Sequence, residues 1–155
     1  MKIVNYPIPG DDQGGELHLY GDASAKTIVI AIPGYPDDQS VLAPMAEHLA
    51  STSSAGGIFV GVTCFPGFQV TKTKNWKNHP TSGYMLEQVV SCIGEAVKKL
   101  RQESTNKSSK LSAIFFDWGA VLGQVWVNRV LHESDSSLQP NDVVLLDILG
   151  PPHPS

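Results

Sequence analysis

The 155-residue sequence lacks any apolar run close to the roughly 18 residues that a membrane-spanning helix needs. Its first residues also lack the apolar segment of a secretory signal peptide. The only two cysteines, Cys64 and Cys92, lie far apart and without metal-ligand spacing. These absences argue against a membrane span, a disulfide-rich secreted domain and a metal site. We therefore expect two reduced thiols in a cytoplasmic protein.

An excess of basic charge is also absent. Eleven Lys and Arg stand against 15 Asp and Glu, so the net charge is −4, and no basic stripe is present. Nucleic acid and anionic membranes are therefore poor candidates as partners. A hydrophobic content of 41% and a charged content of 17% are typical of a globular protein. The length suits one domain, and the chain contains no internal repeat.

Strand and helix patterns alternate along the chain. The expected elements are an antiparallel hairpin of strands 2–8 and 16–20 around a turn-rich loop, strands 27–32, 55–63, 111–116 and 142–149, and helices from about residue 40, over 83–100 and over 119–132. A long loop is expected from residue 64 to about 82. The alternation predicts an α/β fold with a mostly parallel sheet, an N-terminal antiparallel hairpin and helices on both faces.

One strand pattern stops at a carboxylate and turns at once into a helix. The apolar run 113–116 ends at Asp117, and Trp118 and Gly119 follow. A side chain at such a sharp turn is lifted clear of the sheet, and the free N–H groups of the new helix stabilise its negative charge. An ionised carboxylate placed there can act as a nucleophile. The alternative is that Asp117 is simply the N-cap of helix 119–132.

A second loop is expected at the same rim of the sheet. The segment Pro-Gly-Tyr-Pro, residues 33–36, follows strand 27–32. Because ligands of open α/β sheets bind beyond the carboxyl ends of the strands, this loop and Asp117 together predict a site.

Four segments resemble those of one known family, in order along the chain. "FFDWGAVLG" resembles the nucleophile elbow of the α/β-hydrolase family, and its Asp-Trp-Gly-Ala is similar to the epoxide hydrolase and haloalkane dehalogenase branch. "IPGYPDDQS" resembles the oxyanion loop of that branch, "GIFVGVTCFPGF" its next strand and loop, and "VVLLDILGPPHP" a later strand and its exit. The resemblance implies that 1–155 is a single, incomplete hydrolase core, whose cap, acid and catalytic His lie beyond this sequence.

The resemblance also implies roles for particular residues. Asp117 would attack an electrophilic carbon to give an alkyl-enzyme ester, which water activated by a His would cleave. The backbone N–H groups of Tyr35 and Trp118 would form the oxyanion hole, and Gly34, Pro36 and Gly119 would shape the loop and the turn. No metal and no organic cofactor are implied. The substrate would be a small apolar electrophile. Tyr35 favours an epoxide over a haloalkane, whereas the indole N–H of Trp118 is compatible with halide binding.

Three features depart from the family pattern. Pro33 replaces the His of the oxyanion loop, and "TCFPGF" lacks the usual Asp and Arg. Phe115 stands two residues before Asp117, where a small residue is usual, and we expect it to crowd the turn. An alternative therefore stays open: a catalytically inactive, truncated or degenerate relative that binds a ligand or a partner. A nucleotide-binding Rossmann domain is disfavoured, because "IPGYP" has one glycine where the phosphate fingerprint needs three.

The last expected strand, "VVLLDIL", has almost no polar residue to face water. At the edge of a sheet it would expose a row of unpaired backbone groups. We therefore expect self-association through this strand.

Overall fold

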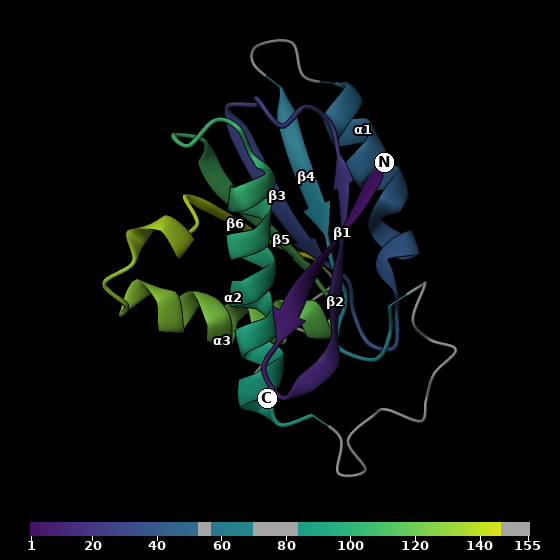
Figure 1. Ribbon diagram of the computed structural model, residues 1–155, viewed down its shortest axis with the longest axis vertical. Coiled ribbons are helices and arrows are strands. Elements are labelled where there is room, and N and C mark those ends of the chain that lie inside the picture. Colours follow the sequence, from purple (N-terminus) through teal and green to yellow (C-terminus); the bar gives the residue numbers. More distant parts are fainter. Residues whose placement is uncertain (53–56, 70–83, 147–155) are drawn as a thin grey trace, which may run out of the picture.

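A computed structural model describes residues 1–52, 57–69 and 84–146 of the chain (Figure 1). Six strands form one sheet in the order β1-β2-β4-β3-β5-β6. The strands are β1 (Lys2–Ile8), β2 (Asp11–Tyr20), β3 (Thr27–Ile32), β4 (Ile58–Val62), β5 (Lys110–Phe116) and β6 (Asp142–Leu146). The helices are α1 (Ala43–Ser51), α2 (Leu86–Glu103) and α3 (Trp118–Leu131), with short 3-10 turns η1 (Gln39–Leu42) and η3 (Ser136–Leu138).

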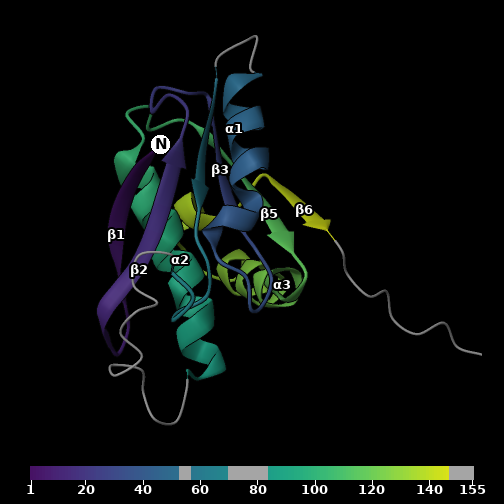
Figure 2. The same cartoon turned by 90° about the vertical axis from the view of Figure 1, so that its right-hand side faces the viewer.

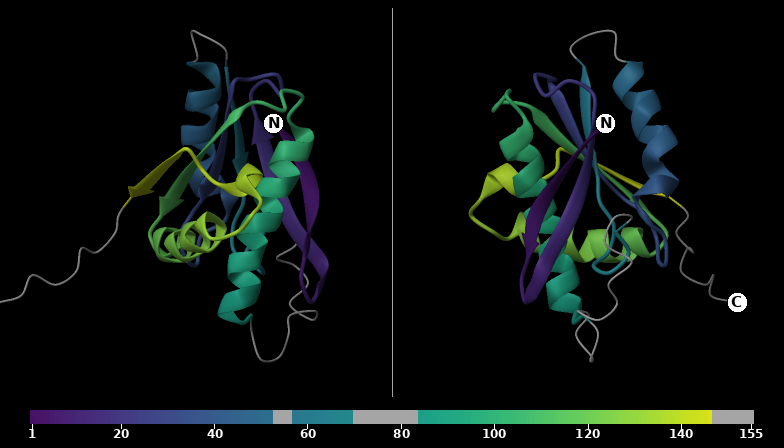
Figure 3. Two further views of the ribbon diagram at one scale, coloured as in Figure 1. Left: turned by 90° about the vertical axis from the view of Figure 1, so that its left-hand side faces the viewer. Right: turned by 45° about the vertical axis from the view of Figure 1, so that its right-hand side comes forward.

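The predicted α/β fold is confirmed. β4, β3, β5 and β6 pair in parallel, whereas β1 and β2 form an antiparallel hairpin that joins the sheet through β4. β1 and β6 are therefore the two edge strands, and Figure 3 shows β6 at the outer side of the sheet. Among the described residues, no helix combines the length and the apolar composition needed to cross a bilayer.

Helices cover both faces of the sheet (Figure 2). On one face, α2 buries Val90, Ile93, Val97 and Leu100, whose spacing of three and four residues places them on one side of the helix. α3 packs into the same apolar cluster through Trp126. On the other face, α1 packs with side chains of β3 and β4 in a second cluster. β3 is covered on both faces, as its continuous apolar run predicts.

β2 is longer than the sequence predicts. It begins at Asp11 rather than at residue 16, and includes two glycines that were expected in a loop. Gly15 pairs with Tyr6 across the hairpin, and a Cβ at Gly15 would lie 2.0 Å from Cζ of Tyr6. The tyrosine ring therefore fills the space above the glycine. This contact with Tyr6 stabilises the strand at Gly15, and local strand propensity takes no account of such a contact.

Two helix starts also differ from the prediction. The chain enters α1 through η1, where the carboxylate of Asp38 accepts a hydrogen bond from the Ser40 N–H at 2.7 Å. α2 runs from Leu86 to Glu103 rather than over 83–100. Residues 147–149 of the last predicted strand, and most of the predicted loop 64–82, lie outside the described residues.

Candidate active site

The strand-to-helix turn lies between β5 and α3, with Asp117 as its corner. Its backbone has φ 52° and ψ −124°, and it is the only non-glycine residue with a positive φ in the described part of the chain. L-residues seldom adopt this conformation, because it crowds Cβ against the backbone. The Asp117 side chain makes no capping hydrogen bond to α3. Its backbone carbonyl accepts from the Ala120 N–H at 2.8 Å, but its carboxylate satisfies none of the free N–H groups at the start of α3.

The sheet brings the loop after β3 against this turn. β3 and β5 are parallel neighbours, and Ile32 pairs with Phe115. The residues that follow the two strands must therefore meet at the same rim. A Cβ at Gly34 would lie 2.3 Å from Oδ2 of Asp117, so the carboxylate lies directly against the Gly34 backbone.

Gly119 allows the helix to start this close to β3. A Cβ at this position would lie 2.6 Å from the carbonyl oxygen of Pro33 and 2.7 Å from that of Ile32. Any other residue would push α3 away from the strand end. The Tyr35–Pro36 peptide bond in the facing loop is cis.

The expectation that Phe115 crowds the turn is wrong. The Phe115 ring is fully buried on the α3 side of the sheet, where it meets Gly123 one turn into the helix. A Cβ on Gly123 would lie 2.4 Å from the ring, so the glycine provides the space that the phenylalanine needs. The Trp126 ring also packs against the Phe115 ring. The centroids of these two rings lie 6.2 Å apart, in an edge-to-face geometry.

Two backbone amides belong to residues that follow directly after the contact between Asp117 and Gly34. Trp118 is the first residue of α3, and Tyr35 follows the glycine that the carboxylate touches. Within the described part of the chain, neither backbone N–H donates to a backbone or side-chain acceptor. By contrast, the Asp117 N–H donates to the Leu146 carbonyl at 3.1 Å. The helix start and this loop can therefore present N–H groups to an anion formed at Asp117.

An apolar pocket of about 230 Å³ opens beside this turn. Its walls are Tyr35, Phe65, Pro66, Phe68, Tyr84, Val89, Trp118 and Leu122. The rings of Tyr35 and Phe68 meet edge to face, with centroids 5.1 Å apart. Sequence reasoning named Tyr35 and Trp118 for their backbone amides and for the choice between an epoxide and a haloalkane, but not as walls of a pocket. Leu122 could have been found from its helical spacing to Trp118, but Tyr84 and Val89 carry no sequence signal that points to a pocket.

Burial raises the pKa of one residue that lines the pocket, Tyr84, and of two cysteines on the elements that carry other lining residues. The pKa of Tyr84 is raised above its ordinary value, mainly by burial. The hydrogen bond that the Tyr84 hydroxyl donates to Asp11 Oδ2 at 2.5 Å is the second cause. Burial raises the pKa of Cys92 from 9.0 to about 12, and raises that of Cys64 well above its ordinary value. Both thiols are therefore protonated at neutral pH and weak nucleophiles.

The described histidines lie away from the pocket. His18 is buried in β2, with its Nε2 3.5 Å from Oε2 of Glu16. His48 belongs to α1, and His132 is the C-cap of α3. His79 and His153 lie outside the described residues. In the described ranges, no group of three or more His, Cys, Asp or Glu side chains gathers in a way that could hold a metal ion.

The fold is similar to those of several solved structures. An epoxide hydrolase described among "novel epoxide hydrolases belonging to the alpha/beta hydrolases superfamily in metagenomes from hot environments" matches 94% of the chain at a TM-score of 0.64 and 13% identity. An epoxide hydrolase from Vigna radiata matches 99% at a TM-score of 0.60 and 14% identity. A thermostable carboxyl esterase from Bacillus coagulans matches 94% at a TM-score of 0.68 and 10% identity.

These likenesses show that the chain has the α/β-hydrolase fold. The matched part is 41% of the metagenomic protein, 41% of the Vigna radiata protein and 44% of the esterase, so the chain spans less than half the length of each. No protein-family model and no curated protein matches the sequence.

Proposed function

We propose that this chain carries the nucleophile of an epoxide hydrolase-like enzyme, with Asp117 as the attacking group. The observation that supports this most strongly is the backbone of Asp117. A strained turn that directs the carboxylate against Gly34, without any capping bond, has no evident structural benefit. The solved epoxide hydrolases with this fold support the same reaction class.

In the proposed first step, an Asp117 carboxylate oxygen attacks an epoxide carbon. The new C–O bond forms as one ring C–O bond breaks. The ring oxygen stays on the neighbouring carbon as an alkoxide, which takes a proton from a water molecule and leaves hydroxide. The product is an alkyl ester of Asp117. The pocket beside the turn would hold the apolar part of the epoxide, because its lining is almost entirely aromatic and aliphatic.

In the proposed second step, water attacks the carbonyl carbon of the ester, and the tetrahedral intermediate then collapses as the bond from the carbonyl carbon to the alkyl oxygen breaks. The diol leaves with a proton, and the Asp117 carboxylate is restored. The oxyanion of the tetrahedral intermediate would be stabilised by the N–H groups of Tyr35 and Trp118. This step needs a general base to take the proton from water. None of the histidines in the described ranges lines the pocket, so we expect the ester to accumulate on this chain.

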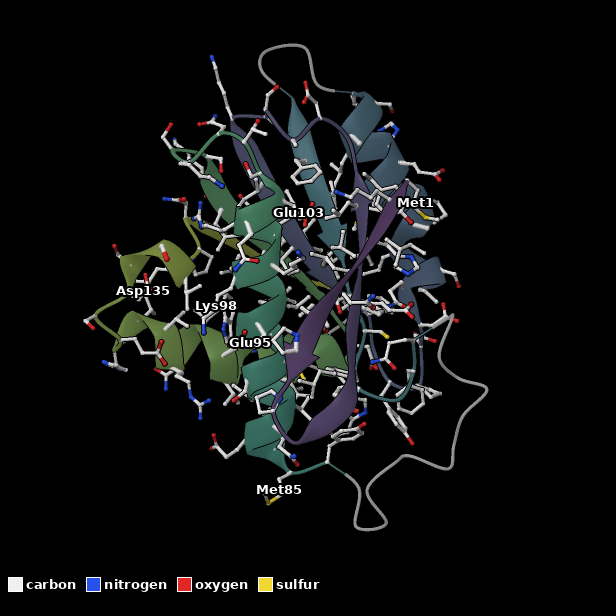
Figure 4. The ribbon with its side chains drawn as sticks, viewed as in Figure 1. Met1, Met85, Glu95, Lys98, Glu103 and Asp135 are labelled. Atoms are coloured by element: carbon white, nitrogen blue, oxygen red, sulfur yellow. The ribbon has the colours of Figure 1, made fainter. Side chains whose placement is uncertain are left out.

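Intact-mass analysis after incubation with styrene oxide tests the proposal. We expect one added mass of styrene oxide, located on Asp117 by peptide mapping, without multiple turnovers. Asp117→Asn should abolish the adduct because the amide is a poor nucleophile. Asp135→Asn is the matched control, because Asp135 lies beyond the far end of α3 and caps η3 (Figure 4). An adduct that persists in Asp117→Asn, or its absence from the unmodified chain, would overturn the proposal.

A further inference from the structure

Two buried glutamines lie directly after the pocket-forming parts of two loops. Gln39 follows loop 33–38, which carries Tyr35, and its side chain is fully buried. Gln69 follows Phe65 and Phe68 in the loop after β4 and is 4% exposed. A buried amide needs hydrogen-bond partners, so the groups that each glutamine binds indicate what it holds in place.

Both glutamines bind the same stretch of β2. β4 ends at Val62, opposite His18, so β2 extends beyond the end of its neighbour. There Nε2 of Gln39 donates to the Glu16 carbonyl at 3.3 Å, and Nε2 of Gln69 donates to the Gly14 carbonyl at 3.4 Å. Two side-chain amides thus bind backbone carbonyls of β2 beyond the point where its pairing with β4 has ended.

Further bonds tie the second loop to this anchor. Oε1 of Gln69 accepts from the Gly67 N–H at 3.1 Å, which fixes the turn before the glutamine. The Thr63 hydroxyl donates to the Glu16 carbonyl at 2.9 Å, at the beginning of the loop. The described part of the loop after β4, residues 63–69, is therefore held to β2 at both of its ends.

The two anchored loops form adjoining walls of the pocket. Tyr35 of the first loop and Phe68 of the second meet edge to face, and both line the pocket. The relative position of these two walls depends on where the loops are held. The described bonds to β2 fix that position at Glu16 and Gly14, two residues apart on one strand.

We propose that Gln39 and Gln69 are positioning residues that fix the relative position of these two walls, and so the shape of the pocket and the size of the apolar ligand it accepts. The inference rests on the proposed function only in taking this pocket as the ligand site. Loss of either amide would release one wall while leaving the sheet and α3 in place.

The test compares two alcohols that differ in size, 1-phenylethanol and 1-(2-naphthyl)ethanol. Each is titrated into the chain while the indole N–H resonance of Trp118 is followed by NMR. The variants are Gln39→Met and Gln69→Met, which keep the length of the side chain and remove its hydrogen bonds. Gln139→Met is the matched control. Gln139 does not line the pocket, and its Nε2 donates to the Val130 carbonyl at a distance of 3.0 Å.

The readout is the ratio of the two dissociation constants. This ratio does not depend on the folded fraction, so a purely destabilising substitution leaves it unchanged. We expect each pocket variant to change this ratio at least threefold, so that the larger alcohol binds more tightly relative to the smaller one. Gln139→Met should leave the ratio unchanged. Where a methionine variant does not fold, the corresponding Gln→Glu variant, which keeps an acceptor but loses the donor, is measured instead.

An unchanged ratio in the folded variants would overturn the inference, as would an unmodified chain that binds neither alcohol. A chain that binds both alcohols but forms no adduct on Asp117 would refute the proposed nucleophile and leave the anchoring role intact.

Discussion

At the scale of single residues, glycines decide how closely the parts of the site approach. Gly34 and Gly119 bring loop and helix against Asp117, and Gly123 accepts the Phe115 ring. In each case a Cβ would lie well inside normal contact distance. The large residue two positions before Asp117 is therefore balanced by a small one six positions after it.

Gly123→Ala should destabilise the fold, although alanine normally improves a helix. The added Cβ would lie 2.4 Å from the buried Phe115 ring, and overpacking of this kind costs about 1–3 kcal/mol. The matched control is Gly94→Ala in α2, where the new Cβ would be in ordinary contact at 3.5 Å from Trp126 Nε1. In that control the free energy of unfolding should rise by about 0.5–1 kcal/mol. Urea denaturation measures both, and an equal gain in the two variants would contradict the expected packing.

The buried thiols should make the fold sensitive to alkali. The pKa of Cys92 is raised from 9.0 to about 12, so above pH 9 the unfolded chain loses a proton that the folded chain keeps. The free energy of unfolding should therefore fall as pH rises from 9 toward 12, by up to about 1.4 kcal/mol per pH unit for each such group.

Denaturation curves at pH 8 and pH 10 check this expectation. Cys92→Ala should reduce the loss of stability between the two values, whereas the neighbouring Ser91→Ala, which removes no titrating group, should not. If Cys92→Ala shows the full loss, the thiol is not its cause. Iodoacetamide at pH 8 should likewise leave both Cys64 and Cys92 unmodified until urea is added.

At the scale of the elements, the hairpin shows how a contact extends a strand. β2 passes through Gly14 and Gly15, which local propensity assigns to a loop. The Tyr6 ring occupies the space above Gly15, and its hydroxyl hydrogen-bonds with Thr63 Oγ1 at 2.7 Å. The ring cannot swing aside, because it is buried and held at both ends.

Gly15→Thr should therefore destabilise the protein, against the usual preference of strands for β-branched residues. The new Cβ would lie 2.0 Å from Tyr6 Cζ, and we expect a loss of about 1–3 kcal/mol. Asn5→Thr, at an exposed position of β1 in the same hairpin, is the matched control and should be neutral or slightly stabilising. Thermal melts followed by circular dichroism compare the two. A stabilising Gly15→Thr would show that the ring does not hold this position.

At the scale of the whole molecule, β6 is an edge strand with apolar side chains on both faces. Val143, Val144 and Leu146 are each about two-fifths exposed, and the described part of the sheet pairs β6 only with β5. Edge strands that persist in water usually carry charges, proline or a bulge. In β6, Asp142 alone is charged.

We expect the chain to associate with itself through β6 as its concentration rises. Val144→Lys, which places a charge on the edge strand, should reduce the association measured by light scattering with size exclusion. Val41→Lys is the matched control, because Val41 is similarly exposed but lies on η1. A monodisperse monomer at every concentration, or an equal effect of both lysines, would contradict association through this edge.

The sequence by itself determined the fold class, the order of the elements and the turn at Asp117. Periodicity marks β3, α2 and α3, and an apolar run that stops at an acid followed by glycine marks the corner. These signals are local, because they depend on residues a few positions apart.

Only the tertiary structure decided which distant residues compensate one another. It placed Gly123 beneath Phe115, carried β2 through Gly15 under the Tyr6 ring, and joined Phe68, Tyr84 and Val89 to Tyr35 and Trp118 around one pocket. It also showed that the Asp117 side chain, although at the N-cap position, makes no capping hydrogen bond to α3. Contacts of this kind join residues far apart along the chain, and whether a side chain fits such a contact depends on the space that its neighbours leave, which no local pattern contains.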